Sequence, residues 1–234
     1  NTIAVLRHGT HEKNLSNLFA WLLDPGGSHR FGNQFAVIFI KHVNARDLFG
    51  RAISENGPWL VEQEVNVSEP LDSKDIADIS LSTGTTAVVI ENYHVSDGHG
   101  HSYDKYFKYG QRLIGEDPDR VPACSSNSFV VLLCQYVDKE RQDASGWKDA
   151  SVVTYAALIT DLIALIESEP EYRLQNENAY GFLKQVESYF IRGEGMPRAK
   201  DLTECVTRQL CILMKVGASS TKINLNFVTT RVEY

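Results

Sequence analysis

The alternation of apolar and polar residues predicts a chain that opens with helices, continues with strands and returns to helices. Near the start, Leu15, Leu18 and Leu22 recur at helical spacing until the breakers at 24–27 end the run. Residues 128–137 form one continuous apolar run, which is typical of a strand buried on both faces. In chain order, the pattern predicts helices over about 11–23 and 31–49, strands over about 59–67, 75–82 and 86–92, a helix over 102–115, a strand over 128–137, helices over 151–168 and 177–193, and finally a helix over about 200–216 before a β-rich stretch over 222–234.

This order of elements predicts an α/β fold with a mixed central β-sheet flanked by helices on both faces. The breakers in the loop 193–201 mark the best candidate for a boundary. We therefore expect one domain over 1–195. We expect residues 196–234 to form a C-terminal helix and strand extension that packs on this core.

Composition narrows the class of protein. Of the 234 residues, 43% are hydrophobic and 23% are charged, as in ordinary globular proteins, and no apolar run approaches the roughly 20 residues of a membrane helix. The four cysteines include no CxxC pair, which favours reduced thiols and a cytoplasmic location. The net charge of −7 gives no basic footprint, so contact with nucleic acid would need a local patch together with bound cations.

Two acids at strand ends are the clearest candidate for chemistry. Asp78 lies in the strand over 75–82, and Glu91 ends the apolar run of the next strand. Carboxylates at adjacent strand ends can bind a hard cation such as Mg²⁺, which prefers oxygen ligands and keeps several waters. The alternative is structural: Asp78 is a turn residue, and Glu91 is a strand-end acid paired with a lysine.

Several phrases resemble the PD-(D/E)XK nuclease superfamily, and in particular a bacterial branch of it, over about 12–190. The helix "NLSNLFAWLLDP" and the strand end "VIENY" carry most of the resemblance. Weaker matches are "VEQEV" around Glu64, "IADISL" around Asp78, "SYDKY" over 102–106 and "VVTY" over 152–155.

The resemblance implies a restriction-endonuclease-like core and a metal-dependent nuclease that hydrolyses DNA phosphodiester bonds. It implies Mg²⁺ as the cofactor, with Mn²⁺ as a substitute, bound by Asp78 and Glu91. It also implies nucleic acid as the partner, in particular DNA, with no membrane association, and leaves a homodimer open.

The sequence departs from the superfamily pattern at the site itself. Tyr93 stands where the superfamily has a lysine that orients the attacking water, and Ser102 stands where it has a glutamine. A neutral phenol can donate a hydrogen bond but brings no positive charge, and losing such a group commonly lowers the rate by about 10²–10³-fold. Lys105 or Lys108 on the following helix could supply the missing charge, unless both are ordinary solvated lysines.

A third carboxylate is expected near the metal, and the resemblance gives this place to Glu12 or Glu64. Glu12 could instead stabilise the start of its helix. The aromatic residues of the helix after Glu91 could stack on bases or pack that helix on the sheet. They are Tyr103, Tyr106, Phe107 and Tyr109.

The segment "HVSDGHGH" brings together His94, His99, His101 and Asp97. Histidines of this density could bind zinc or act as a general base or phosphate contact, although no strict ligand spacing is present. The plainer expectation is a polar, mobile loop at the mouth of the site.

Three classes of function therefore stay open. The first is a metal-dependent nuclease with an atypical site. The second is a catalytically inactive nuclease-like domain that serves as a structural or interaction module in a DNA-processing or defence assembly. The third is an unrelated α/β binding protein, which would be favoured if Asp78 and Glu91 lay far apart.

Overall fold

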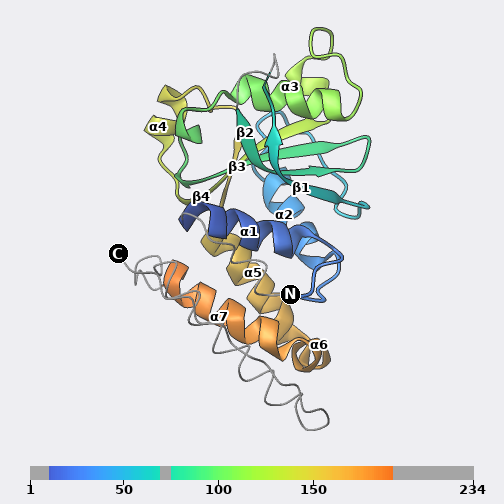
Figure 1. Ribbon diagram of the computed structural model, residues 1–234, viewed down its shortest axis with the longest axis vertical. Helices are drawn as coiled ribbons and strands as arrows, with labels where there is room; N and C mark the ends of the chain where they lie inside the picture. Colours follow the sequence, from blue (N-terminus) through green and yellow to red (C-terminus); the bar gives the residue numbers. More distant parts are fainter. Residues whose placement is uncertain (1–10, 69–74, 192–234) are drawn as a thin grey trace, which may run out of the picture.

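The computed structural model describes residues 11–68 and 75–191 of the chain, apart from the side chains of 11–12 and 189–191 (Figure 1). The extension predicted over 196–234 lies outside these residues. The elements are α1 (His11–Leu23), α2 (Gln34–Asn44), β1 (Leu60–Asn66), β2 (Ile76–Ser82), β3 (Ala87–Val95), the short 3-10 turn η2 (Gly98–Gly100), α3 (Tyr103–Leu113), the 3-10 turn η3 (Ala123–Ser125), β4 (Ser128–Tyr136), α4 (Lys139–Ala144), β5 (Ser151–Thr154), α5 (Tyr155–Ser168), α6 (Pro170–Gln175) and α7 (Glu177–Ile191).

The described strands form one mixed sheet in the order β1-β2-β3-β4-β5. The pairs β1–β2 and β2–β3 are antiparallel, whereas β3–β4 and β4–β5 are parallel. The sheet has α1, α2, α5 and α7 on one side and α3 on the other (Figure 1). The predicted α/β class with a mixed central sheet is confirmed. None of the helices in the described ranges is long and apolar enough to cross a membrane.

One stretch predicted as helix is wrong. Ser151–Thr154 form β5, which pairs in parallel with β4, and the helix begins only at Tyr155. The β-branched residues Val152 and Val153 favour a strand. Thr154 then starts the helix, because its side chain accepts a hydrogen bond from the backbone N–H of Ala157. The second predicted helix also ends earlier than expected, at Asn44.

Strand β3 is buried on both faces and separates two apolar clusters. Val88 and Ile90 belong to the larger cluster, which fills the space between the sheet and α1, α2, α5 and α7. Val89 points to the other side, into a smaller cluster with Tyr106 of α3 and Trp147. The alternation along β3 therefore directs Glu91 to the side of α3.

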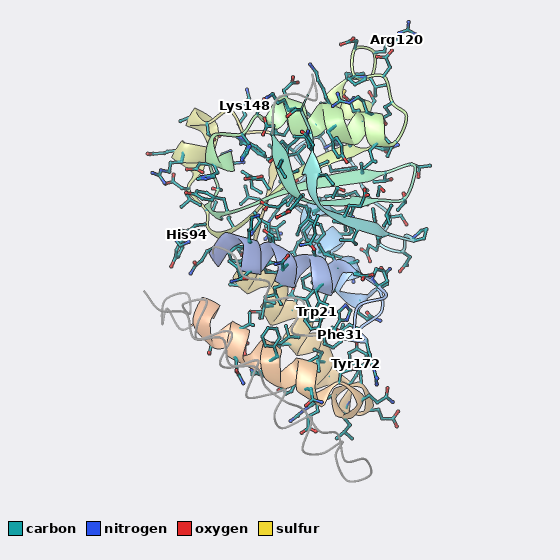
Figure 2. The ribbon with its side chains drawn as sticks, in the orientation of Figure 1. Trp21, Phe31, His94, Arg120, Lys148 and Tyr172 are labelled. Atoms are coloured by element: carbon teal, nitrogen blue, oxygen red, sulfur yellow. The ribbon has the colours of Figure 1, made fainter. Side chains whose placement is uncertain are left out.

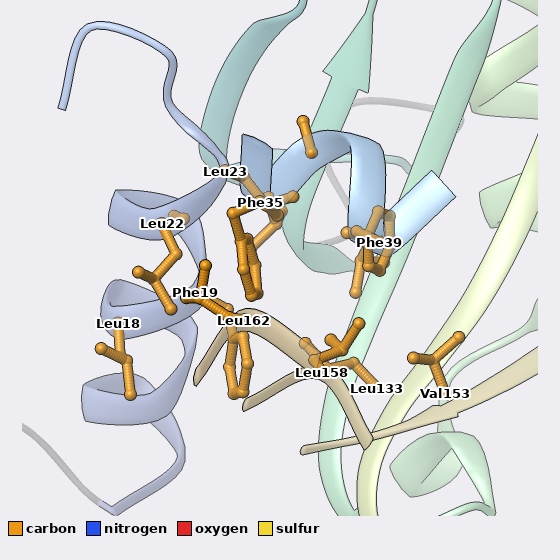
Figure 3. Packing of buried hydrophobic residues seen from close by; sticks show 14 of the residues in the cluster. Leu18, Phe19, Leu22, Leu23, Phe35, Phe39, Leu133, Val153, Leu158 and Leu162 are labelled. Atoms are coloured by element: carbon orange, nitrogen blue, oxygen red, sulfur yellow. The ribbon is translucent and has the colours of Figure 1, made fainter. Parts of the chain in front are cut away.

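The larger cluster is built from side chains of helices that are distant in sequence (Figure 3). Phe19 of α1 stacks on Phe35 of α2 at 6.2 Å between ring centroids and on Tyr155 of α5 at 5.2 Å. Phe31 belongs to the same cluster and contacts Tyr172 of α6, with their ring centroids 5.6 Å apart (Figure 2).

Two local features hold the smaller side of the fold together. Gly110 lets α3 approach the sheet, because a Cβ at this position would lie 2.2 Å from the Ser128 Oγ. The Ser128 hydroxyl itself donates to the Phe107 carbonyl at 2.9 Å. Arg51 pairs with Asp47 at 2.6 Å, and the same guanidinium donates to three backbone carbonyls. Those carbonyls belong to Ala123, Ser126 and Ser128.

Candidate functional site

The candidate site lies where β2 and β3 part. Their ladder runs as far as the pair Ile79–Ile90, and the next facing positions are Asp78 and Glu91. The backbone N–H of Asn92 donates to the Asp78 Oδ2 at 2.9 Å. A side-chain carboxylate thus accepts the hydrogen bond that would otherwise continue the ladder, and the two predicted metal ligands lie at neighbouring places on adjacent strands.

A chain of hydrogen bonds fixes the Asp78 carboxylate from the side of α1. The Ser16 hydroxyl donates to the Asp78 Oδ1 at 3.0 Å and accepts from the Asn92 side-chain amide at 2.8 Å. The Tyr155 hydroxyl donates to the Asn92 Oδ1 at 2.6 Å. Residues of α1, β3 and α5 therefore determine where this carboxylate lies.

Glu91 is held from α3. Its side chain is buried, with 3% of the residue exposed, and its Oε2 accepts from the Tyr106 hydroxyl at 2.5 Å. Burial raises the pKa of Tyr106 well above its usual value, and the charge of Glu91 raises that pKa further. The phenol therefore stays protonated and remains a donor to Glu91 at all ordinary pH values.

Asp75, which the sequence analysis did not predict, contacts two basic side chains, those of Lys105 and His101. Lys105 donates to the Asp75 Oδ2 at 2.9 Å, and the His101 Nδ1 contacts its Oδ1. Burial alone would raise the pKa of Asp75, but the hydrogen bonds from Lys105 and His101 outweigh it and lower that pKa. The Nε2 of His101 lies 3.8 Å from the Glu91 Oε1. The lysine predicted to supply a charge thus pairs with Asp75, three residues before Asp78.

Tyr93 follows Glu91 by two positions and lies on the same side of β3. Its ring stacks on His99, with 4.0 Å between ring centroids. His94 points elsewhere, packs edge-on against Tyr136 at 5.0 Å and lies at the margin of the molecule (Figure 2). The rings of His99 and His101 are 6.3 Å apart, so the histidines expected to form a cluster face different groups.

The segment expected to be a mobile loop has a defined conformation. The backbone N–H of His101 donates to the Gly98 carbonyl at 2.8 Å, and the Trp147 indole donates to the His101 carbonyl at 2.9 Å. The Asp97 carboxylate accepts from the His99 N–H at 3.1 Å. Hydrogen bonds from both ends therefore hold this turn against the smaller apolar cluster.

Glu64 lies opposite Asp78 in the register of β1 and β2. It is exposed, has a left-handed backbone with φ of 52°, and pairs with Lys13 at 2.9 Å. The hydrogen bond and charge of Glu64 raise the pKa of Lys13, and the charge of Asp78 adds to this. Lys13 is therefore a second amine beside the site. The side chain of Glu12 lies outside the described part of the structure.

The aromatic residues of α3 mainly pack that helix on the sheet. Tyr106 and Phe107 are buried in the smaller cluster, which confirms the packing interpretation for them. Tyr103 stacks on Phe107 at 6.1 Å. Ser102, at the glutamine position of the superfamily, is the N-terminal cap of α3 and is half-buried.

The donor set of the site is suited to a hard cation. Within residues 11–68 and 75–191, no three His, Cys, Asp or Glu side chains form a group that could hold a metal by themselves. Asp78 and Glu91 offer carboxylate oxygens that are already oriented by hydrogen-bond donors. Mg²⁺ and similar ions are commonly bound through one or two carboxylates, with waters and substrate phosphates completing the shell. The two carboxylates fit this pattern.

Comparison with known proteins identifies a family. The model described as the PD-(D/E)XK nuclease superfamily matches residues 1–185. No curated protein and no solved structure matches the chain.

Proposed function

This chain belongs to the PD-(D/E)XK nuclease superfamily, and from that premise we propose that it is a metal-dependent nuclease that hydrolyses DNA phosphodiester bonds at Asp78 and Glu91. The observation that carries the proposal is the opening of the β2–β3 ladder. Asp78 and Glu91 come from different strands and occupy the next facing positions of the register there, and separate sets of donors fix each carboxylate.

Asp78 and Glu91 would hold Mg²⁺ or Mn²⁺. Such an ion, when bound, lowers the pKa of a bound water and offsets charge on the scissile phosphate. Ser16 and the Asn92 N–H keep the Asp78 carboxylate in place, and Tyr106 does the same for Glu91. These donors leave each carboxylate little freedom to rotate, so the ligands are ordered before the substrate arrives.

Tyr93 makes the proposed site atypical. The phenol offers a hydrogen bond in place of the lysine charge, and the amines beside the site are Lys13 and Lys105, each already paired with an acid. We therefore expect cleavage that is slow by about 10²–10³-fold relative to a site with the lysine in place.

The proposal is tested by incubating the protein with plasmid DNA, linear DNA and RNA in Mg²⁺ or Mn²⁺. Asp78→Asn should abolish cleavage. Glu171→Gln is the matched control, because it removes an exposed carboxylate on α6, a helix that contributes no residue to the site, and should leave the rate unchanged. Equal cleavage by the wild type and Asp78→Asn would refute the proposed site, and faster cleavage of RNA would correct the substrate.

A second candidate is a catalytically inactive nuclease-like module within a DNA-processing or defence assembly. The observation that favours it is Tyr93, whose ring is occupied in a stack with His99. DNA binding by a chain that cuts nothing in either metal would support this candidate. Light scattering of the purified chain would test the homodimer that the resemblance leaves open.

A further inference from the structure

The stacked pair of Tyr93 and His99 lies beside the proposed ligands, and the hydrogen bonds described above for Asp78 and Glu91 come from other side chains and from the backbone. Tyr93 is half-buried and His99 is exposed, with 4.0 Å between the ring centroids and 27° between the ring planes. Residues two apart on a strand are separated by roughly 7 Å, so this pair lies about one side-chain length from Glu91. The His99 side of the pair is thus exposed to solvent next to the site, with the His101 ring 6.3 Å away.

The backbone that presents His99 is strained. His99 has φ of 48°, and its neighbours Gly98 and Gly100 also have positive φ, of 65° and 81°. Glycine tolerates this region, whereas a residue with a side chain is uncommon there. Gly98 is further required because a Cβ would lie 2.0 Å from the Trp147 indole nitrogen. The chain thus places a large aromatic ring at a turn position that asparagine or glycine would occupy with less strain.

Packing gives little reason for this ring. An exposed histidine removes little apolar surface from water, and strain of this kind is concentrated at functional sites. Stacking between an aromatic side chain and a base is tolerant of sequence, since every base has a π-face. In a duplex, neighbouring bases cover both faces of each base, so an unpaired base is the form that can stack on His99.

We propose that the Tyr93–His99 pair is a stacking site for an unpaired nucleobase, and that the nucleic acid engaged here is single-stranded or has an unpaired end. The proposal rests on the proposed function insofar as the ligand is a nucleic acid. Tyr93, at the position of the superfamily lysine, would thus serve as the inner ring of this stacking site. His99 would contact the base, and Tyr93 would support His99 from below.

The test uses a single-stranded DNA oligonucleotide that carries 2-aminopurine, whose fluorescence is quenched by stacking. Ca²⁺ replaces Mg²⁺, so that binding is measured without cleavage. His99→Asn removes the ring and suits the left-handed backbone, and His94→Asn is the matched control, because it makes the same change at an exposed histidine outside the stack. We expect His99→Asn to weaken binding about tenfold and to remove the quenching, with no loss of melting temperature. His94→Asn should change none of these.

An oligonucleotide with an abasic site provides the second arm. It should bind the wild type and His99→Asn equally weakly, since the base is the group that the ring contacts. Three results would each overturn the stacking site. They are equal quenching by the wild type and His99→Asn, an equal loss of affinity in His99→Asn and His94→Asn, and no binding of the oligonucleotide by the wild type. Cleavage is measured in parallel with Asp78→Asn. Binding that depends on the His99 ring, without any cleavage, would refute hydrolysis but support the stacking site. Cleavage by a protein whose binding is unchanged in His99→Asn would support hydrolysis but refute the stacking site.

Discussion

Replacing Gly110 with alanine tests whether the close approach of α3 to the sheet keeps the site intact. The new Cβ would lie 2.2 Å from the Ser128 Oγ and 3.2 Å from the Val89 Cγ2. Overpacking of this kind costs about 1–3 kcal/mol, and loss of the buried hydrogen bond from Ser128 to Phe107 costs about 1 kcal/mol more. The higher helix propensity of alanine returns about 1 kcal/mol.

Gly110→Ala should thus lower the free energy of unfolding by about 2 kcal/mol, which corresponds to roughly 6 °C in melting temperature for a domain of this size. Because the same helix carries Tyr106, the shift should also loosen Glu91 and weaken Mn²⁺ binding. Thermal and urea unfolding measure the first effect, and calorimetric titration with Mn²⁺ measures the second.

Ser128→Ala provides the compensating change, because it removes the oxygen that the new methyl group would meet. Alone, it should cost about 1 kcal/mol. Combined with Gly110→Ala, it should restore most of the lost stability, so that the double variant is more stable than Gly110→Ala alone. Simple additivity of the two losses, or wild-type stability of Gly110→Ala, would show that α3 is not held by this contact.

Three further predictions concern charge. Tyr93→Lys should raise the cleavage rate by about 10²–10³-fold when both Mg²⁺ and DNA are saturating, since it restores a cation beside Glu91. An unchanged rate under these conditions would contradict the proposed role of that position. Burial lowers the pKa of His29 in the folded protein, so the unfolded chain takes up the proton first. The contribution of neutral His29 to the free energy of unfolding should therefore be fully present above about pH 6.5 and decrease as the pH falls below that value. Urea titrations should show that the free energy of unfolding of His29→Gln depends less on pH. Arg51→Lys should lower the free energy of unfolding by about 3 kcal/mol, because a lysine cannot pair with Asp47 and also reach three carbonyls. A decrease of less than about 1 kcal/mol in urea unfolding would contradict the stabilising role of these Arg51 contacts.

The architecture follows from local patterns along the chain. Apolar runs in β3 and β4 predict buried strands, and the helical spacing around Leu18 predicts α1, because burial of these side chains dominates folding. Ser151–Thr154 were misread as helix because four residues are too few to show a period. Pairing with β4, a tertiary contact, decided their conformation.

The site could be predicted only in part. Glu91 could be predicted because it is an acid at the end of an apolar strand, where a charged side chain needs a partner. Asp75 and Lys13 carry no such signal, because their roles depend on side chains brought close by the fold. Ser16, which reaches Asp78 across 62 positions of sequence, shows the same dependence on tertiary structure. The strained turn at His99 was likewise invisible, because glycines on both sides of a histidine suggest flexibility more readily than a fixed ring.

The link from Asp78 through Ser16 and Asn92 to Tyr155 joins the proposed ligand to two helices of the main core. Because the folded core holds this carboxylate in place, a cation bound at Asp78 should stabilise the folded domain and raise its melting temperature. Melting curves recorded in a series of divalent salts would then rank the cations by preference before any substrate is known.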